Sequence, residues 1–239
     1  MDRRQAGALS AAFINRAEQF LGWLKRNRRY TTHDRPLKLN LGSGLVYVPG
    51  WIGVDIGLYA TMKPWPGRIL RMLYRKSGWR DALAQDEYVR LLKNGHFIQH
   101  DLARGIPFPD ATVDCIFASH FLDSLTQAQG EAILAEVFRV LRPDGMLRIS
   151  VSDLDKNIEL YAAGKREEAL ARFFPQSESR PNLRYFMYDW QTLQSALARA
   201  GFVDICRREF QKGDFPDVEL LDNRPDESLF VEAHKSLTR

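Results

Sequence analysis

Three features with defined spacing could bind a nucleotide-like ligand. Gly42 and Gly44 follow the alternating segment 37–41, and glycines at the end of a strand let the backbone turn tightly and approach a ligand closely. Asp55 ends a second apolar segment, where a carboxylate can accept hydrogen bonds from both hydroxyls of a ribose. Asp101 ends a third apolar segment, where its carboxylate can accept a hydrogen bond from an adenine amino group. Each feature alone is explained as well by an ordinary turn, but their order along the chain predicts a cofactor site at one edge of a sheet.

A second group of residues could move a proton. His120 follows a strand predicted over 113–118, and an imidazole can take a proton from a hydroxyl near neutral pH. Asp123 and Asp153 could orient His120 or act in its place. A loop histidine packed beside the cofactor is an equally good explanation of His120. His96 and His100 flank core residues of a strand without a third ligand, so we expect no metal site.

The elements that must position these residues alternate between strands and helices, which is typical of an α/β, doubly wound sheet. Apolar patterns predict strands at 37–41, 51–56, 96–101, 113–118, 146–151, 202–206 and 228–233. Helices are expected at 10–30, within 58–94, after the capping box that begins at Thr126, over 155–174, and from Asp189 to Gly201. Residues 142–145 are expected to form a turn.

Basic charge gathers in two segments. Residues 1–38 contain nine Lys or Arg against three Asp or Glu, and residues 58–96 contain eight against three. We expect residues 1–35 to form an amphipathic helix and a linker, and 36–239 to form the main domain, with 58–94 inserted as an acceptor lid. The apolar stripes of both segments could pack on the domain. Alternatively, the two segments form one surface for an anionic or lipid-linked acceptor at a membrane, or a homodimer contact.

Composition narrows the class of protein. The chain has 239 residues, of which 45% are hydrophobic, and neither a secretory signal nor an apolar run of about 20 residues is found. Two cysteines, Cys115 and Cys206, cannot form a disulfide framework. The local basic patches do not resemble a nucleic-acid-binding face. These features predict a soluble, cytoplasmic protein that could act at the inner face of the membrane.

Longer motifs in the sequence indicate a protein family. They are Leu39-Asn40-Leu41-Gly42-Ser43-Gly44, Gly50-Trp51-Ile52-Gly53-Val54-Asp55-Ile56, Asp101-Leu102, Ile106-Pro107-Phe108-Pro109-Asp110, Glu136 to Gly145, and Arg148-Ile149-Ser150-Val151. From Leu37 to about Ala233 the sequence resembles the class I S-adenosylmethionine-dependent methyltransferases. The resemblance implies a Rossmann-like, seven-stranded sheet whose last strand is antiparallel, with S-adenosyl-L-methionine as cofactor. It implies cofactor contacts at Asn40, Leu41, Gly42, Ser43, Gly44, Asp55, Ile56, Asp101, Leu102 and Ser119.

A looser resemblance concerns the acceptor. The Gly-Trp-Ile-x-Val-Asp-Ile phrase and the segment 221–229 are similar to small bacterial methyltransferases of polysaccharide, lipopolysaccharide or capsule biosynthesis. This implies O-methylation of a sugar hydroxyl of a glycan or glycolipid precursor. The chain departs from relatives at Leu122-Asp123-Ser124, where many carry Leu-Glu-His, and at Val151-Ser152-Asp153, where many carry Val-Pro-Asp. A small-metabolite or lipid methyltransferase and a non-catalytic partner subunit therefore stay open. Arg224 and Glu227 are candidates for the acceptor pocket or for a surface turn.

Overall fold

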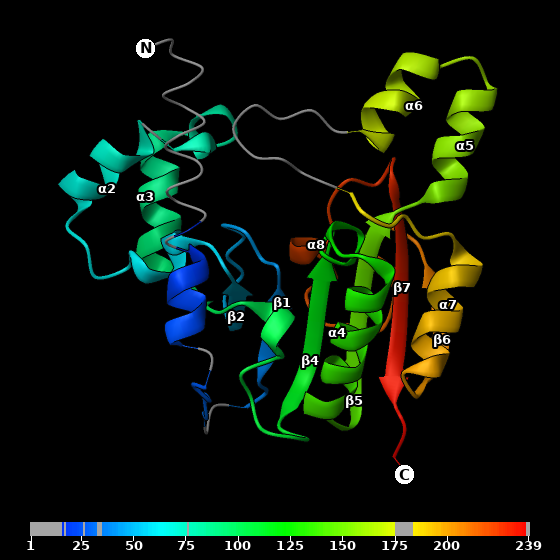
Figure 1. Ribbon diagram of the computed structural model, residues 1–239, viewed down its shortest axis with the longest axis horizontal. Helices are drawn as coiled ribbons and strands as arrows, with labels where there is room; N and C mark the ends of the chain where they lie inside the picture. The colour runs from blue at the N-terminus through cyan, green and yellow to red at the C-terminus, as the bar shows by residue number, and fades with distance from the viewer. Residues whose placement is uncertain are drawn as a thin grey trace.

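The computed structural model describes residues 16, 18–25, 27–32, 35–75, 77–174 and 184–237. Its centre is one seven-stranded sheet in the order β3-β2-β1-β4-β5-β7-β6 (Figure 1). The strands are β1 (Lys38–Leu41), β2 (Trp51–Asp55), β3 (His96–Gln99), β4 (Val113–Ser119), β5 (Leu141–Ser152), β6 (Phe202–Arg208) and β7 (Ser228–Lys235). Only β7 runs antiparallel to its neighbours β5 and β6. The predicted fold class is therefore confirmed.

The strand order determines where a ligand can bind. β1 pairs in parallel with β2 on one side and with β4 on the other, so the direction of winding reverses at β1. In open α/β sheets, such a reversal leaves a crevice beyond the carboxyl ends of the strands. The glycine turn after Leu41, the carboxylate of Asp55 and the residues after Ser119 all lie at this edge.

Two helices cover one face of the sheet over the main core. α4 (Gln127–Val140) begins at Thr126, whose side chain forms the predicted capping box with Gln129. α7 (Trp190–Arg199) begins at Asp189, which forms a second capping box with Thr192. Their buried faces join the apolar side chains of β1, β4, β5 and β7 in a single cluster. α4 and α7 are thereby held side by side (Figure 1).

The segment 155–174 is helical, as expected, and is divided into two helices. It forms α5 (Leu154–Ala162) and α6 (Arg166–Phe173), which pack against each other. Gly164 lies between them with φ of 87°, a left-handed conformation that ends a helix. The turn expected at 142–145 is wrong, because β5 already begins at Leu141 and its pairing with β4 shifts register there. At this shift in register, the backbone of Asp144 adopts a left-handed conformation with φ of 64°.

The insertion between β2 and β3 is helical. It contains the short 3₁₀ helices η1 (Leu58–Thr61) and η2 (Gly78–Asp81) and the α-helices α2 (Gly67–Tyr74) and α3 (Gln85–Asn94). These helices enclose a small core of their own around Leu70, Tyr88 and Leu92, beside the β3 edge (Figure 1).

The N-terminal helix is described at Arg16 and 18–24. The remaining positions of the helix expected at 10–30 that fall at 10–15, 17 and 26 lie outside the described residues. The boundary at residue 35 and the lid role of residues 58–94 stay predictions.

A third apolar cluster covers the opposite face of the sheet, where α8 (Val218–Leu221) packs near Trp51 and Phe117. Arg148 is fully buried at the middle of β5 and binds Asp222 and Glu232. In the part of the chain that the structure describes, no helix is long and apolar enough to cross a membrane.

Candidate active site

The glycine turn after β1 is held close to the neighbouring elements. Gly42 has φ of 62° and donates its backbone N–H to Val54, at 2.9 Å. A Cβ atom at Gly42 would lie 2.6 Å from the ring of Phe121, closer than any side chain tolerates. Gly44 has φ of 53°, and the ring of Trp79 from the insertion lies over it. Glycine is therefore needed at residue 42 for both its conformation and its lack of a side chain.

Asp55 lies at the carboxyl end of β2, as the spacing predicts. One oxygen of its carboxylate accepts a hydrogen bond from the Gly44 N–H at 3.1 Å, and the other accepts one from the Gly57 N–H at 2.8 Å. An ionised carboxylate has about four lone-pair positions, so two remain for the hydroxyls of a ribose. Asp55 thus fixes the glycine turn and keeps the acceptor capacity that the cofactor needs.

Asp101 lies beyond β3, at the start of η3 (Leu102–Arg104). Its carboxylate accepts hydrogen bonds from the Ala103 N–H and from Nε of Arg104, both at 3.1 Å. The backbone of Gly22 in the N-terminal helix lies against it, since a Cβ there would be 3.1 Å from Cβ of Asp101. Asp101 therefore keeps lone pairs for an adenine amino group, at the point where the N-terminal helix meets the sheet edge.

These residues surround one cavity of about 410 Å³, within the range of about 300–1,000 Å³ that is usual for ligand pockets. The cavity brings together six predicted positions, which are Gly42, Asp55, Ile56, Asp101, Leu102 and His120. Its other wall belongs to the first turns of α4, including Gln129 and Glu136. The size and the arrangement of glycines and carboxylates fit S-adenosylmethionine.

His120 lies on this cavity in an unusual backbone conformation. Its φ is 48°, in the left-handed region that non-glycine residues seldom adopt and that is enriched at functional sites. Its Nε2 lies 3.0 Å from Oγ of Ser228, whose own hydroxyl donates to the carbonyl of Arg224. Nδ1 faces a carboxylate oxygen of Asp123 at 3.4 Å.

Asp123 is 2% exposed and lies in η4 (Leu122–Ser124), next to His120. Burial by itself would raise the pKa of Asp123, but hydrogen bonds from His120 and Ser152 and the charge of Arg184 outweigh it, so the pKa lies below its ordinary value. The Ser152 hydroxyl donates to Asp123 at 2.9 Å. Arg184 lies 3.8 Å from the same oxygen and 3.5 Å from Glu227. Asp123 is thus an ionised carboxylate that can orient an imidazole.

The structure does not bring every predicted residue to the cavity. Asp153 is buried as the N-cap of α5, where it accepts from two backbone N–H groups and pairs with Arg207 at 3.2 Å. No contact with His120 supports a catalytic role for Asp153, which stays a prediction. The Ser119 hydroxyl accepts hydrogen bonds from Ser150 and from the amide of Asn223. The predicted positions that do not line the cavity are Asn40, Leu41, Ser43, Gly44, Ser119, Asp123 and Asp153.

Sequence reasoning missed four residues around His120. These are Phe121, whose ring covers Gly42, and the His120 or Asp123 partners Ser152, Arg184 and Ser228. Phe121 directly follows His120, so its position was a local signal. The other three come from distant parts of the chain.

Among the described residues, no group of three His, Cys, Asp or Glu could hold a metal ion. The Nε2 atom of buried His100 faces the Gly105 carbonyl.

Part of the chain matches a known protein family. Residues 77–149 match the family described as "Methyltransferase domain". No curated protein matches the chain. The apo form of the S-adenosylmethionine-dependent methyltransferase SibL is 18% identical, with a TM-score of 0.49, and covers 84% of this chain and 51% of its own. The chain thus spans about half the length of SibL.

Two solved structures have nearly the length of this chain. One is from Thermotoga maritima, a SAM-dependent methyltransferase described as a "possible histamine N-methyltransferase". It is 12% identical over 95% of this chain and 97% of that chain, with a TM-score of 0.51. The other is a SAM-dependent methyltransferase from Archaeoglobus fulgidus. It is 16% identical over 96% of this chain and 94% of that chain, with a TM-score of 0.49.

The Thermotoga structure shows the shared fold, and the matched family covers the segment from the insertion to β5. The sheet order with its antiparallel β7 is the one implied by the class I resemblance. Residues 77–149 therefore match a methyltransferase domain, and the sheet as a whole has the fold of the Thermotoga structure.

Proposed function

We propose that this protein is an S-adenosylmethionine-dependent methyltransferase that O-methylates a sugar hydroxyl of a bacterial glycan or glycolipid precursor. The observation that carries the proposal is the pair of His120 and Asp123, with His120 on the cavity beside the glycine turn. A hydroxyl acceptor must lose its proton during transfer, and imidazole is suited to accept it near neutral pH. The looser resemblance to enzymes of polysaccharide biosynthesis supports a sugar as the owner of that hydroxyl.

S-adenosylmethionine supplies a methyl group on a sulfonium sulfur, which needs no metal for transfer. Gly42 lets the backbone come close to the cofactor, and Asp55 holds its ribose. With the cofactor bound, its methyl group would be available to an acceptor oxygen in the cavity, and His120 would take the proton of the acceptor hydroxyl. Asp123 orients the ring and balances the imidazolium charge. Its lowered pKa makes Asp123 a weak base, which favours the orienting role over a direct one.

The Ser228 hydroxyl marks where an acceptor could bind. It lies 3.0 Å from Nε2 of His120, so a hydroxyl fits at this nitrogen. In the tautomer whose Nδ1–H points to Asp123, Nε2 has a free lone pair, so an acceptor hydroxyl that replaces Ser228 there can pass its proton to the ring. The exchange is easy to reverse, because Ser228 keeps its second hydrogen bond, to the Arg224 carbonyl.

Methyl-labelled S-adenosylmethionine tests the proposal. The protein is incubated with glycan, lipid and small-metabolite fractions of a bacterial extract, and the labelled product is located by mass spectrometry and NMR. We expect label in the glycan or glycolipid fraction, as a methyl ether on a sugar carbon. Label in a free metabolite, or on an amine nitrogen, would overturn the proposed acceptor.

We also propose that the two basic segments hold the enzyme at an anionic membrane face, where a lipid-linked acceptor would be found. In the N-terminal helix, Phe20 and Leu24 are 60% and 59% exposed. In α2, Met72 is 59% exposed and is flanked by exposed Arg68 and Arg75. Exposed apolar side chains among cations are typical of helices that lie on anionic lipid.

Vesicle sedimentation tests this surface. Each cation near an anionic membrane contributes about 1 kcal/mol, so replacing Arg68 and Arg75 by Gln should weaken binding to phosphatidylserine vesicles about thirtyfold. Binding of the unchanged protein should fall as salt rises. Lys165→Gln with Arg166→Gln, on exposed α6, is the matched control and should bind normally. Equal binding of both double variants would rule out a membrane role for α2.

A further inference from the structure

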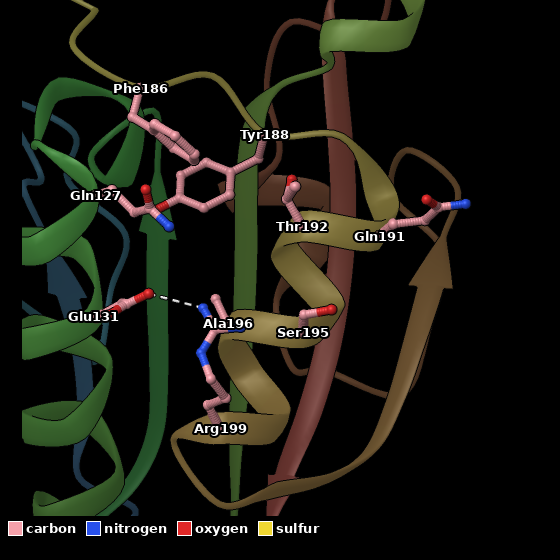
Figure 2. Close-up of a pocket in the computed structure, with 9 residues that line it drawn as sticks. All are labelled: Gln127, Glu131, Phe186, Tyr188, Gln191, Thr192, Ser195, Ala196 and Arg199. Carbon is pink, nitrogen blue, oxygen red and sulfur yellow. Dashed lines mark hydrogen bonds and ion pairs between the residues drawn. The ribbon is translucent and has the colours of Figure 1, made fainter.

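A second cavity lies between α4 and α7, separate from the one around Asp55. It encloses about 290 Å³ and shares no lining residue with the first cavity. Gln127 and Glu131 come from α4, Arg199 from α7, and Phe186 and Tyr188 from the segment before α7 (Figure 2). Its volume is close to the lower end of known ligand pockets, about 300 Å³, so it suits a ligand of about one ring.

Tyr188 is the unusual residue of this cavity. It is 1% exposed, and its hydroxyl has no hydrogen-bond partner among the described residues. Figure 2 shows the ring extending from the segment before α7 toward α4. A Cβ atom at Gly130 of α4 would lie 2.6 Å from the hydroxyl, so the glycine leaves room for it. A buried hydroxyl without a partner destabilises a fold, and its retention needs an explanation.

The chemistry around Tyr188 indicates the kind of partner. Burial above all, and then the charges of Glu131 and Asp123, raise the pKa of Tyr188 to about 12, so the group stays a hydroxyl donor near neutral pH. Glu131 and Arg199 form an ion pair at 2.8 Å across the cavity and cancel each other's charge (Figure 2). No hydrogen bond to the Gln127 side chain is found within the described ranges. Phe186 packs edge-on against Tyr188, with centroids 4.9 Å apart, and adds an apolar wall.

This cavity is connected to the catalytic edge through the backbone. The N–H groups of Tyr185 and Phe186 donate to the carbonyl of Asp123, at 2.9 and 3.4 Å. Tyr188 is paired with Asp153 by a parallel bridge. The segment 185–188 therefore contacts both the second cavity and the loop that carries His120 and Asp123. An extended acceptor that meets His120 could continue along this segment.

We propose that the cavity between α4 and α7 binds an uncharged sugar unit of the acceptor, next to the unit that is methylated. A neutral sugar ring offers hydroxyls to Tyr188, Gln127 and the Glu131–Arg199 pair, and its apolar C–H face packs on the aromatic wall. The inference rests on the proposed glycan acceptor and locates the part of the enzyme that recognises it.

Tyr188→Phe separates binding from folding, because it removes only the hydroxyl. The matched control is Tyr185→Phe, whose ring is 59% exposed and does not line the cavity. Saturation-transfer NMR of the full chain with the methyl glycosides of glucose, galactose, mannose and rhamnose measures binding without cofactor or turnover. We expect Tyr188→Phe to weaken the glycoside that binds best by about fivefold or more, as loss of one hydrogen bond does.

The same variant should be more stable than the parent protein. Removing a buried hydroxyl without a partner should raise Tm by about 2–4 °C in a protein of this size. Tyr185→Phe should change neither Tm nor binding. Absence of binding by all four glycosides, or equal binding to the parent and Tyr188→Phe, would overturn the inference.

The two proposals can fail separately. Tyr188-dependent glycoside binding without methyl transfer to glycans would leave this inference standing and remove the glycan acceptor from the proposed function. Methyl transfer to glycans without such binding would support the proposed function and overturn this inference.

Discussion

The carboxylate of Asp55 holds the N–H groups of Gly44 and Gly57, and we predict that it also binds the ribose of the cofactor. Asp55→Ala should weaken binding of S-adenosylhomocysteine by about 1–3 kcal/mol in calorimetry, because the hydroxyls lose a charged acceptor. Asp81→Ala, on the exposed part of the insertion, should bind normally. NAD should give no heat with either protein. Unchanged affinity of Asp55→Ala would place Asp55 outside the site.

His120 requires a variant that keeps its backbone conformation. Its φ of 48° is better tolerated by Asn than by Ala, so His120→Asn removes the imidazole with little strain. Turnover should fall by about 10²–10⁴-fold, as expected for loss of a general base, with cofactor affinity unchanged. His234→Asn on β7 is the control. Near-normal turnover in His120→Asn, measured across pH, would transfer the role to Asp123 or Asp153, or show that the acceptor loses its proton without help.

Among the elements, the turn after β1 depends on its contact with Phe121. Gly42→Ala places a Cβ atom 2.6 Å from the Phe121 ring in a backbone with φ of 62°. Gly164→Ala, between α5 and α6, has a similar conformation at φ of 87° but open space around the new atom. Gly164→Ala should lose about 1 kcal/mol of stability from its backbone conformation alone. Gly42→Ala should lose more, because the Phe121 ring must also shift. Only Gly42→Ala should also lose S-adenosylhomocysteine affinity, by more than about tenfold. Equal affinities would mean that the turn does not approach the cofactor.

At the scale of the whole molecule, Arg148 joins the central strands to the segment before β7. It is fully buried and contacts Asp222 at 2.8 Å and Glu232 at 2.6 Å. Arg148→Met should lower the free energy of unfolding in urea by about 3–5 kcal/mol, because it leaves two buried carboxylates with one fewer cation. Arg71→Met breaks the exposed pair with Asp86 and should cost at most about 1 kcal/mol. Similar losses in the two variants would contradict the assigned role of Arg148.

Local signals in the sequence determined most of the elements. Apolar alternation located all seven strands, and the patterns at Thr126 and Asp189 located the starts of α4 and α7, because a capping box involves residues only three apart. The same holds for Gly42, Asp55 and Asp101, which lie at strand ends that the alternation reveals. The break between α5 and α6 has a local signal as well, since Gly164 ends a helix readily.

Tertiary structure alone decided which side chains meet at those strand ends. His120 contacts Ser228 across 108 positions of sequence, and Ser119 contacts Asn223 across 104. Such contacts follow from the order of strands in the sheet, which places β7 beside β5 although β6 precedes it in the chain. The same order packs α7 against α4 and buries Tyr188 between them. No period or spacing within one segment carries that information. The strand-end positions of Gly42, Asp55 and Asp101 were therefore predictable from sequence, whereas the surroundings of His120 and the second cavity were not.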